Sequence, residues 1–215
     1  MNAMNKAILI ILAITIPVSV GIYVSGKKFA SGDITTQLKQ ATYLYDQQKA
    51  IADFTLVDQH NNTFTPNSIK GAWTFWFFGF THCPDVCPIT LSTLSATVNQ
   101  LKSTHNIEDE IKIIFVSVDP ERDNLAKLKS YTSSFSEYAL GVTADADQLA
   151  PFLKNMGIIA VKQLPRQGSS EYQVDHSSSI YLIAPDTGIS ALFSTPHNAE
   201  DIAQDFLTIR KFYTR

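Results

Sequence analysis

The only two cysteines of this 215-residue chain lie four residues apart, in the segment THCPDVCP at residues 81–88. Positions i and i+4 of a helix share one face, so Cys83 and Cys87 could form a disulfide or hold a thiophilic metal. A helix N-terminus stabilises a thiolate through its dipole and free amides, which favours ionisation of Cys83. Asp85 lies between the thiols and either opposes this ionisation or tunes a bound cation.

A purely structural disulfide is the less favoured interpretation, because closing so short a loop removes little entropy from the unfolded chain. A metal site needs more than two thiolates: structural zinc usually takes four protein ligands, whereas soft sulfur with imidazole suits copper. Three of the five histidines lie in polar turns or loops and are interpreted as solvated surface residues: His60, His105 and His197. His82 adjoins Cys83, but a neighbour at a strand exit is expected to point away from it.

The cysteine segment lies between two elements that must position it. Residues 73–80 are a continuous aromatic run of strand length, which predicts a buried central strand. Apolar residues then recur at helical spacing, which predicts a helix over about 84–103. Residues 111–118 predict a second buried strand, and Asp123 could cap a helix that continues to about residue 134.

The rest of the chain continues this alternation of strands and helices. We expect a hairpin around residues 61–62, a strand at 140–143, a helix at 147–156, strands at 158–164 and 171–174, a hairpin of 179–184 with 189–193, and a last helix from Asn198. The order implies parallel central strands with helical crossovers and a closing antiparallel hairpin. The predicted fold is therefore α/β, with a central mixed sheet flanked by helices, and it resembles the thioredoxin fold.

His176 is the strongest candidate for a third metal ligand. It lies in VDHSSS, residues 174–179, directly before the apolar strand at 180–184. In a thioredoxin-like sheet the loop entering that strand lies beside the cysteine loop, and thioredoxins place a proline there. This chain has no proline between residues 174 and 183. A histidine there could reach both sulfurs and complete a Cys2His site, and the alternative is a hydrogen-bonded loop histidine that binds nothing.

The N-terminus predicts a membrane anchor. Residues 7–24 are almost entirely apolar and flanked by lysines, a run of about 18 residues at the short end of a transmembrane helix. A cleaved secretory signal is the alternative. We therefore divide the chain into an anchor at 1–28, a linker at 29–50 and a globular domain at 51–215.

The net charge is −3 with no basic run, which gives no indication of nucleic-acid binding.

Three motifs in this order resemble the Sco/SenC family: FGFTHCPDVCP at 78–88, VSVDPERD at 116–123, and DHS at 175–177 with its following strand. The anchor before a thioredoxin-like domain fits as well, and the resemblance covers about residues 54–212. It implies that one copper ion binds to Cys83, Cys87 and His176. Asp119 matches an acidic position near the family's metal site, and from its chemistry alone it is a helix cap or an outer partner of the ligands.

The resemblance also implies a role in maturing the dinuclear copper centre of cytochrome c oxidase subunit II. We expect a copper metallochaperone, which is not an enzyme, with other copper chaperones or thiol reductants as further partners. The alternative is a thiol–disulfide oxidoreductase, with Cys83 attacking and Cys87 resolving, that acts on subunit II or another exported protein. Peroxidase activity is a weaker option that rests on the fold alone. The expected location is the bacterial inner membrane, with a single-pass anchor and the domain in the periplasm.

Overall fold

The structure is a computed structural model, and it describes residues 34–44, 50–105, 107, 110–163 and 172–213. The chain divides into two units, residues 1–37 and 38–215. In the first unit, the described residues form a 3-10 helix, Ile34–Gln37. The apolar run at 7–24 that predicted an anchor lies outside the described residues. None of the helices that the structure does describe has the length and apolar character needed to span a membrane.

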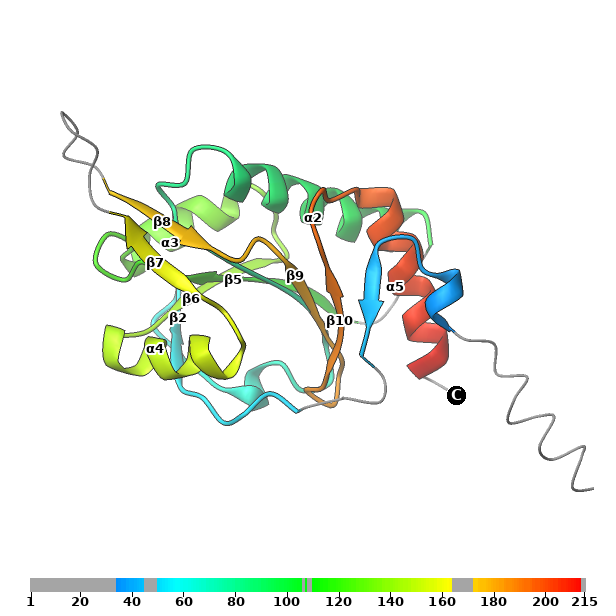
Figure 1. The fold of residues 1–215 in the computed structure, drawn as a ribbon, viewed down its shortest axis with the longest axis horizontal. Coiled ribbons are helices and arrows are strands. Elements are labelled where there is room, and N and C mark those ends of the chain that lie inside the picture. The colour runs from blue at the N-terminus through cyan, green and yellow to red at the C-terminus, as the bar shows by residue number, and fades with distance from the viewer. Residues whose placement is uncertain (1–33, 45–49, 106, 108–109, 164–171, 214–215) are drawn as a thin grey trace, which may run out of the picture. The chain divides into compact units, whose positions relative to one another are not determined.

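The second unit is built on an eight-stranded mixed sheet with the order β1-β10-β9-β4-β5-β6-β2-β3 (Figure 1). The strands of this sheet are β1 (Ala41–Tyr43), β2 (Leu56–Asp58), β3 (Thr63–Phe64), β4 (Trp73–Gly79), β5 (Ile111–Ser117), β6 (Ala139–Thr143), β9 (Ile180–Ile183) and β10 (Ile189–Phe193). Strands β4, β5 and β6 are parallel, and β9 pairs with β4 antiparallel. This is the mixed α/β arrangement that the sequence predicted.

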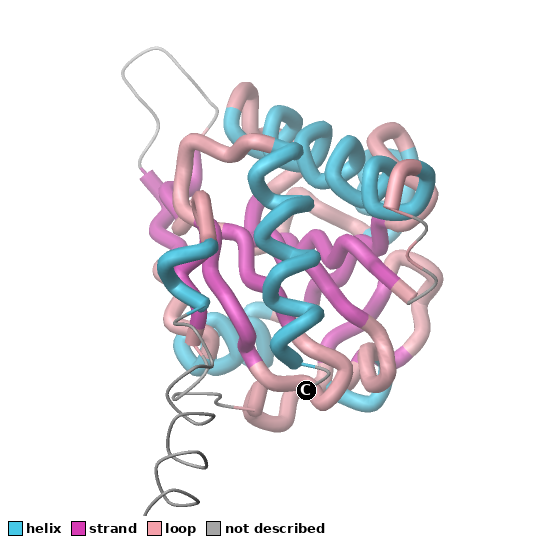
Figure 2. Tube along the Cα trace, turned by 90° about the vertical axis from the view of Figure 1, so that its right-hand side faces the viewer, coloured by secondary structure: helices cyan, strands magenta, loops and turns pink. Residues whose placement is uncertain are grey.

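The helices and one separate hairpin complete the unit. The helices are the 3-10 helix η3 (Pro66–Ser68) and the α-helices α2 (Val86–Ser103), α3 (Leu125–Ser133), α4 (Ala146–Asn155) and α5 (Ala199–Tyr213). Strands β7 (Ala160–Gln163) and β8 (Gln173–His176) form a two-stranded antiparallel sheet of their own. In Figure 1, α2 and α4 lie on opposite sides of the large sheet, and Figure 2 shows α5 beside α2.

Strand β4 is the centre of the core, and all its residues are buried. Its alternate side chains enter two different layers. Trp76 and Phe78 contact Phe152 of α4, with ring centroids 6.1 and 6.4 Å away. On the other face, Phe75 lies 5.7 Å from Phe206 of α5. A strand that is covered on both faces has no solvent-exposed side, so its sequence does not alternate between apolar and polar residues. This explains the uninterrupted aromatic run.

Two predictions about helix starts need correction. Helix α2 begins at Val86, whereas a start near residue 84 was expected, so Pro84 lies before the helix and not in its first turn. Helix α3 is capped by Asn124, whose side chain accepts a hydrogen bond of 2.9 Å from the Lys127 amide. Asp123, the residue predicted to cap this helix, is buried and directed elsewhere. Asn and Asp cap helices about equally well, so residue type alone could not choose between neighbours.

The large sheet extends into the range 29–50 that sequence analysis interpreted as a linker, because β1 pairs with β10. A buried carboxylate holds this edge strand. Asp205 of α5 accepts hydrogen bonds from the backbone amides of Lys39, Gln40 and Ala41, at 2.8, 2.8 and 2.7 Å. A three-residue strand is too short to show a periodic pattern, and its partner acid lies about 165 residues away in the chain.

We expect Asp205→Ala to lower the free energy of unfolding by on the order of 2–3 kcal/mol, because three amides lose a charged acceptor. Urea denaturation measures this loss. Asp201→Ala is the matched control: its ion pair with Lys39 is exposed, so its loss should change stability by less than about 0.5 kcal/mol. Equal losses for the two variants would contradict the assignment of Asp205 as the residue that holds β1.

Candidate metal centre

The cysteine loop joins the end of β4 to the start of α2. Cys83 lies in this loop, and its backbone amide donates to the Phe80 carbonyl at 3.2 Å. Cys87 is the second residue of α2 and is fully buried, while Cys83 is partly exposed, and both thiols are free. The amide of Cys87 donates to the sulfur of Cys83 at 3.4 Å. The two thiols therefore do not share a helix face as the i, i+4 spacing suggested: Cys83 instead faces the open N-terminus of the helix.

His176 reaches this loop from the end of β8. Its Nδ1 lies 2.9 Å from the carbonyl oxygen of Ser177. A carbonyl can only accept a hydrogen bond, so Nδ1 carries the proton and Nε2 keeps its lone pair. Nε2 lies 3.6 Å from Cys87 Sγ, and the edges of Phe77 and Phe80 confine the ring, with centroids at 6.1 and 5.9 Å. This is the tautomer of a metal-binding imidazole that is oriented by a backbone carbonyl.

The ligand atoms of Cys83, Cys87 and His176 all lie within 4.8 Å of one another, so these three residues could hold a metal ion. Two ligands of one ion are typically about 3.5–4 Å apart, given bond lengths near 2.0–2.3 Å. Only small side-chain movements would be needed to bring the three ligand atoms within bonding distance of one metal ion. The structure thus brings together the three residues that sequence analysis selected.

Within the described part of the chain, the other histidines lie outside this cluster. The ring of His82 turns to Asp123 and Lys127, with contacts of 3.6 and 3.3 Å, as its position at a strand exit predicted. His60 and His105 are exposed, in agreement with the prediction. His197 is a correction: it is half-buried, its Nδ1 lies 3.5 Å from Thr90 Oγ1, and burial lowers its pKa.

The two thiols differ in acidity because they share a proton. The pKa of Cys83 is lowered to about 4, first by the hydrogen bond from the Cys87 thiol and then by the backbone amides of Cys87 and Asp85. The pKa of Cys87 is raised by its bond to Cys83 and by burial. The two alternatives for the Asp85 side chain, opposing the thiolate or tuning a bound cation, stay predictions, while its backbone amide supports the thiolate. The cluster therefore holds one thiolate readily, and a bound cation would have to displace the second proton.

Gly79 makes room for the buried thiol. A Cβ atom at this position would lie 2.7 Å from Cys87 Sγ and 2.9 Å from a ring carbon of Phe115. Real Cβ atoms do not approach other heavy atoms so closely, so any larger residue must displace Cys87 or the core beneath it. Gly79 lies in the motif at residues 78–88, but its role could not be predicted from the sequence, because this contact joins a strand end to a helix that follows a loop.

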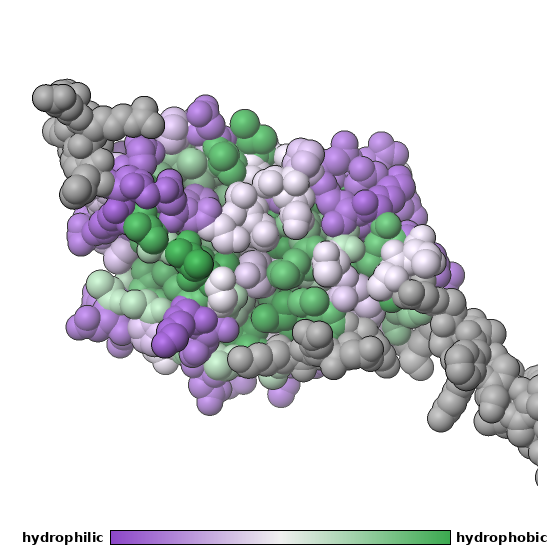
Figure 3. Space-filling view, viewed as in Figure 1, coloured by the Kyte–Doolittle hydropathy of each residue, from purple (hydrophilic) through white to green (hydrophobic). Residues whose placement is uncertain are grey.

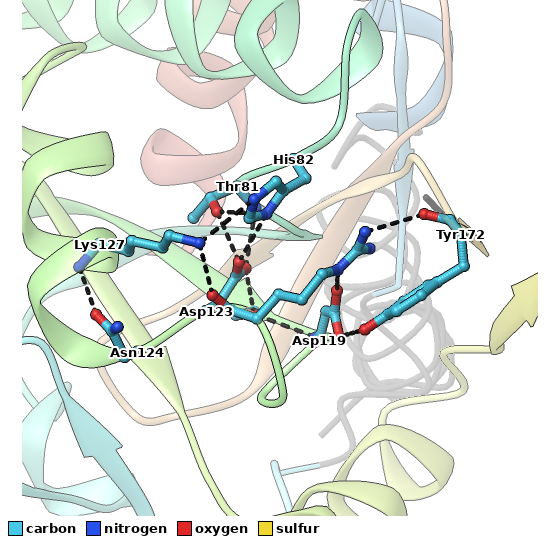
Figure 4. A network of polar contacts seen from close by, with 9 residues as sticks. Thr81, His82, Asp119, Asp123, Asn124, Lys127 and Tyr172 are labelled. Carbon is cyan, nitrogen blue, oxygen red and sulfur yellow. Dashed lines mark hydrogen bonds and ion pairs between the residues drawn. The ribbon is translucent and has the colours of Figure 1, made fainter. Parts of the chain in front are cut away.

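Asp123 ties the cysteine loop to the end of β5, as the close-up shows (Figure 4). Its carboxylate is almost fully buried and accepts hydrogen bonds from the Thr81 amide at 2.9 Å, the Thr81 hydroxyl at 2.6 Å and the Ser117 hydroxyl at 2.7 Å. Asp119 does not cap α3 either: its buried carboxylate accepts from Arg122 and Tyr172. Both acids follow a buried strand at the carboxyl edge of the sheet, where ligand sites gather.

Fold and site together define a thioredoxin-like protein with a Cys2His metal-binding cluster at the carboxyl end of its central strands. The family model described as SCO1/SenC matches residues 43–211, so the chain belongs to the SCO1/SenC family. The sequence is 31% identical over 198 residues to a protein named for copper binding from Stutzerimonas stutzeri, with 91% of this chain and 90% of that one covered.

A mitochondrial relative and a solved structure extend the comparison. The chain is 35% identical over 150 residues to the SCO2 homolog of Bos taurus, which covers 70% of this chain and 56% of that protein. The chain thus spans little more than half of this relative's length. The crystal structure of Arabidopsis thaliana ScoI with copper bound has a TM-score of 0.72 at 27% identity, covering 77% of this chain and all of that one.

Gly79→Ala should displace the Cys87 sulfur and lower the free energy of unfolding by about 1–3 kcal/mol, as expected for overpacking. Urea denaturation of the reduced protein measures the loss. The loss should be smaller when Cys87 is also alanine, because the closest clashing atom is then gone. Gly188→Ala is the control, since its Cβ would meet only the flexible Asp186 carboxylate. An equal loss with and without the Cys87 sulfur would contradict the steric role.

The lowered pKa of Cys83 makes the stability of the reduced, metal-free protein depend on pH. The folded thiol ionises near pH 4, whereas its ordinary pKa is 9.0. Between these values the folded state binds fewer protons than the unfolded state, so stability rises with pH and is lost as pH falls toward 4. We expect the difference in unfolding free energy between wild type and Cys83→Ser to grow with pH across this window, as measured by urea denaturation. A difference independent of pH would contradict the assignment.

Proposed function

We propose that this protein is a copper metallochaperone that binds one copper ion through Cys83, Cys87 and His176. The observation that carries the proposal is the convergence of two sulfurs and one imidazole nitrogen within 4.8 Å. Thiolate with imidazole is the donor set that suits copper and disfavours harder cations such as magnesium and calcium. The copper-binding name of one relative and the copper-bound structure of another support the choice of metal.

Three protein ligands suit transfer better than storage. Without a fourth protein ligand, an acceptor's ligand can attack the metal before a donor ligand leaves, and partly exposed Cys83 is the ligand that an acceptor would approach. Both thiols must be reduced to bind a metal, so copper loading and disulfide formation exclude each other. Oxidation of the pair would therefore release the ion, and reduction would restore the site.

We infer that the acceptor is a protein, and that it is subunit II of cytochrome c oxidase. The second part of this inference rests on the family. The surface supports the first part: among the described residues, the large hydrophobic side chains that are exposed are Val86, Ile89, Ile159 and Val161. Val86 and Ile89 belong to the first turns of α2, while Ile159 precedes β7 and Val161 lies in it. The four side chains therefore lie near the elements that carry the ligands. Figure 3 shows hydrophobic and hydrophilic surface side by side over β7 and β8.

The location belongs to the same proposal. The apolar run at residues 7–24 would anchor the chain in the bacterial inner membrane, and the domain would lie in the periplasm. This placement is supported by the apolar character of the run and by the site of the proposed acceptor, whose copper centre would face that compartment. Other copper chaperones or thiol reductants would then supply copper and electrons there.

Thiol–disulfide exchange is the second candidate function, and the acidity of Cys83 favours it. The Cys83 thiolate would attack a disulfide of the target and form a mixed disulfide, expelling one target thiolate. Cys87 would lose its proton, attack Cys83 and expel the second target thiolate. The target would end as a dithiol and this protein as a disulfide. This reaction needs the two cysteines and no histidine ligand.

We expect the reduced wild-type protein to bind one copper ion per chain, with sulfur-to-copper charge-transfer absorption for Cu(II). Titration against a chromophoric chelator measures the Cu(I) affinity. Cys83→Ser, Cys87→Ser and His176→Ala should each lower it at least roughly ten-fold, since outer partners alone contribute about 10–100-fold. His82→Ala is the control, because its ring faces Asp123. Wild-type affinity in His176→Ala would show that the third ligand is wrongly assigned.

The same variants separate the two functions. His176→Ala should keep its ability to reduce a disulfide substrate, because both cysteines are intact, while it loses tight copper binding. If the wild type binds no copper but reduces the disulfide of a subunit II peptide, the exchange function is correct and the metallochaperone function is not.

A further inference from the structure

The hairpin that carries His176 stands apart from the main sheet. Strand β8 pairs with β7, and within the described part of the chain neither strand belongs to the eight-stranded sheet. Figure 1 shows the hairpin extending from one end of the unit. Two strands alone are marginally stable, so contacts outside the ladder must fix where His176 lies relative to the thiols.

Tyr172, four residues before His176, makes those contacts. Its hydroxyl donates to Asp119 Oδ1 at 2.6 Å, and its carbonyl accepts from Arg122 Nη1 at 3.0 Å. The guanidinium carbon of Arg122 lies 3.5 Å from the centroid of the Tyr172 ring, a stacked cation–π arrangement. Arg122 in turn donates through Nε to Asp119 Oδ2 at 2.5 Å. One residue of the hairpin is thus held at its hydroxyl, its ring and its backbone (Figure 4).

The loop that contacts Tyr172, through Asp119 and Arg122, is itself hydrogen-bonded to the end of the sheet. The amides of Arg122 and Asp123 donate to the Asp119 carbonyl at 3.2 and 3.0 Å, and the Asp119 amide donates to the Ser117 hydroxyl at the end of β5. Asp119 is completely buried, so its carboxylate has no solvent to replace a lost partner. An exposed ion pair from Lys162 to Glu121, 2.6 Å long, adds a weaker link to β7.

A single segment, residues 117–123, therefore contacts both halves of the site. Through Asp123 it holds the cysteine loop at Thr81, and through Asp119 and Arg122 it holds the hairpin at Tyr172. The guanidinium also lies 5.5 Å from the ring centroid of Phe80, a residue that borders His176. The relative position of the thiols and the imidazole thus depends on this segment.

We propose that Tyr172 and Arg122, together with Asp119, are positioning residues that hold the β7–β8 hairpin so that His176 Nε2 faces the two thiols. The proposal rests on the proposed function, because it assigns these residues to the affinity of the same site. Tyr172 is not itself counted as a ligand: it acts through His176. A residue that merely stabilised the fold would affect copper binding in the same way whether or not His176 was present.

The test uses Tyr172→Phe in the reduced full-length chain, with Cu(I) affinity measured by chelator competition. This change removes the bond to Asp119 and keeps the ring beneath Arg122. We expect a loss of about ten-fold, the effect typical of an outer partner of a metal ligand. In the His176→Ala background the same change should cause no further loss, because the ligand through which it acts is absent. Tyr138→Phe, before β6 at the opposite end of the sheet, is the matched control.

Hydrogen exchange of the metal-free protein provides a readout that does not depend on copper. In Tyr172→Phe the amides of β8 should exchange faster, while those of β4 and β5 should keep their wild-type rates. Given that the wild type binds copper, three results would each overturn the proposal: an unchanged copper affinity in Tyr172→Phe, an equal loss of affinity in the His176→Ala background, or an unchanged exchange of the β8 amides. If the wild type bound no copper, the proposed function would fail, and β8 exchange would still decide whether Tyr172 positions the hairpin.

Discussion

The buried carboxylate of Asp123 joins two segments that the chain separates by about 40 residues. It accepts the Thr81 amide and hydroxyl from the cysteine loop and the Ser117 hydroxyl from the end of β5. A charge without solvent must be fully hydrogen-bonded, so both segments are held in one geometry. The thiols, the open end of α2 and the loop that contacts Tyr172 are all arranged around this carboxylate.

Proton sharing between the two thiols bears on both candidate functions of the site. Cys83 ionises easily because Cys87 donates to it, and Cys87 resists ionisation for the same reason and because it is buried. A soft cation can replace the shared proton, and an oxidant can replace both protons with a sulfur–sulfur bond. The proposed copper transfer and the alternative thiol exchange would therefore use one pair of atoms, and His176 is the residue that would distinguish them.

Much of the fold could be predicted from local sequence patterns. The aromatic run at β4, the hairpin of β9 and β10 and the amphipathic helix α5 follow from periodicity and turn residues, which act over a few residues. The positions that were assigned wrongly depend instead on contacts between residues far apart in the chain. Asp123 was assigned to a helix cap and β1 to a linker, because the partners that decide their roles lie far away in the chain. A buried carboxylate and a solvated cap have the same local sequence.

The sequence alone determined the donor set: two cysteines at fixed spacing, a histidine before a strand where thioredoxins have proline, and motifs that indicate the family. Residue chemistry and short-range order suffice for these. Only the tertiary structure decided that Cys83 faces the helix end, that Gly79 admits the Cys87 sulfur, and that Nε2 of His176 is the free nitrogen. These depend on contacts within about 4 Å that join residues near in the chain, and residue spacing does not specify them because the path of each loop is set only when the core has packed.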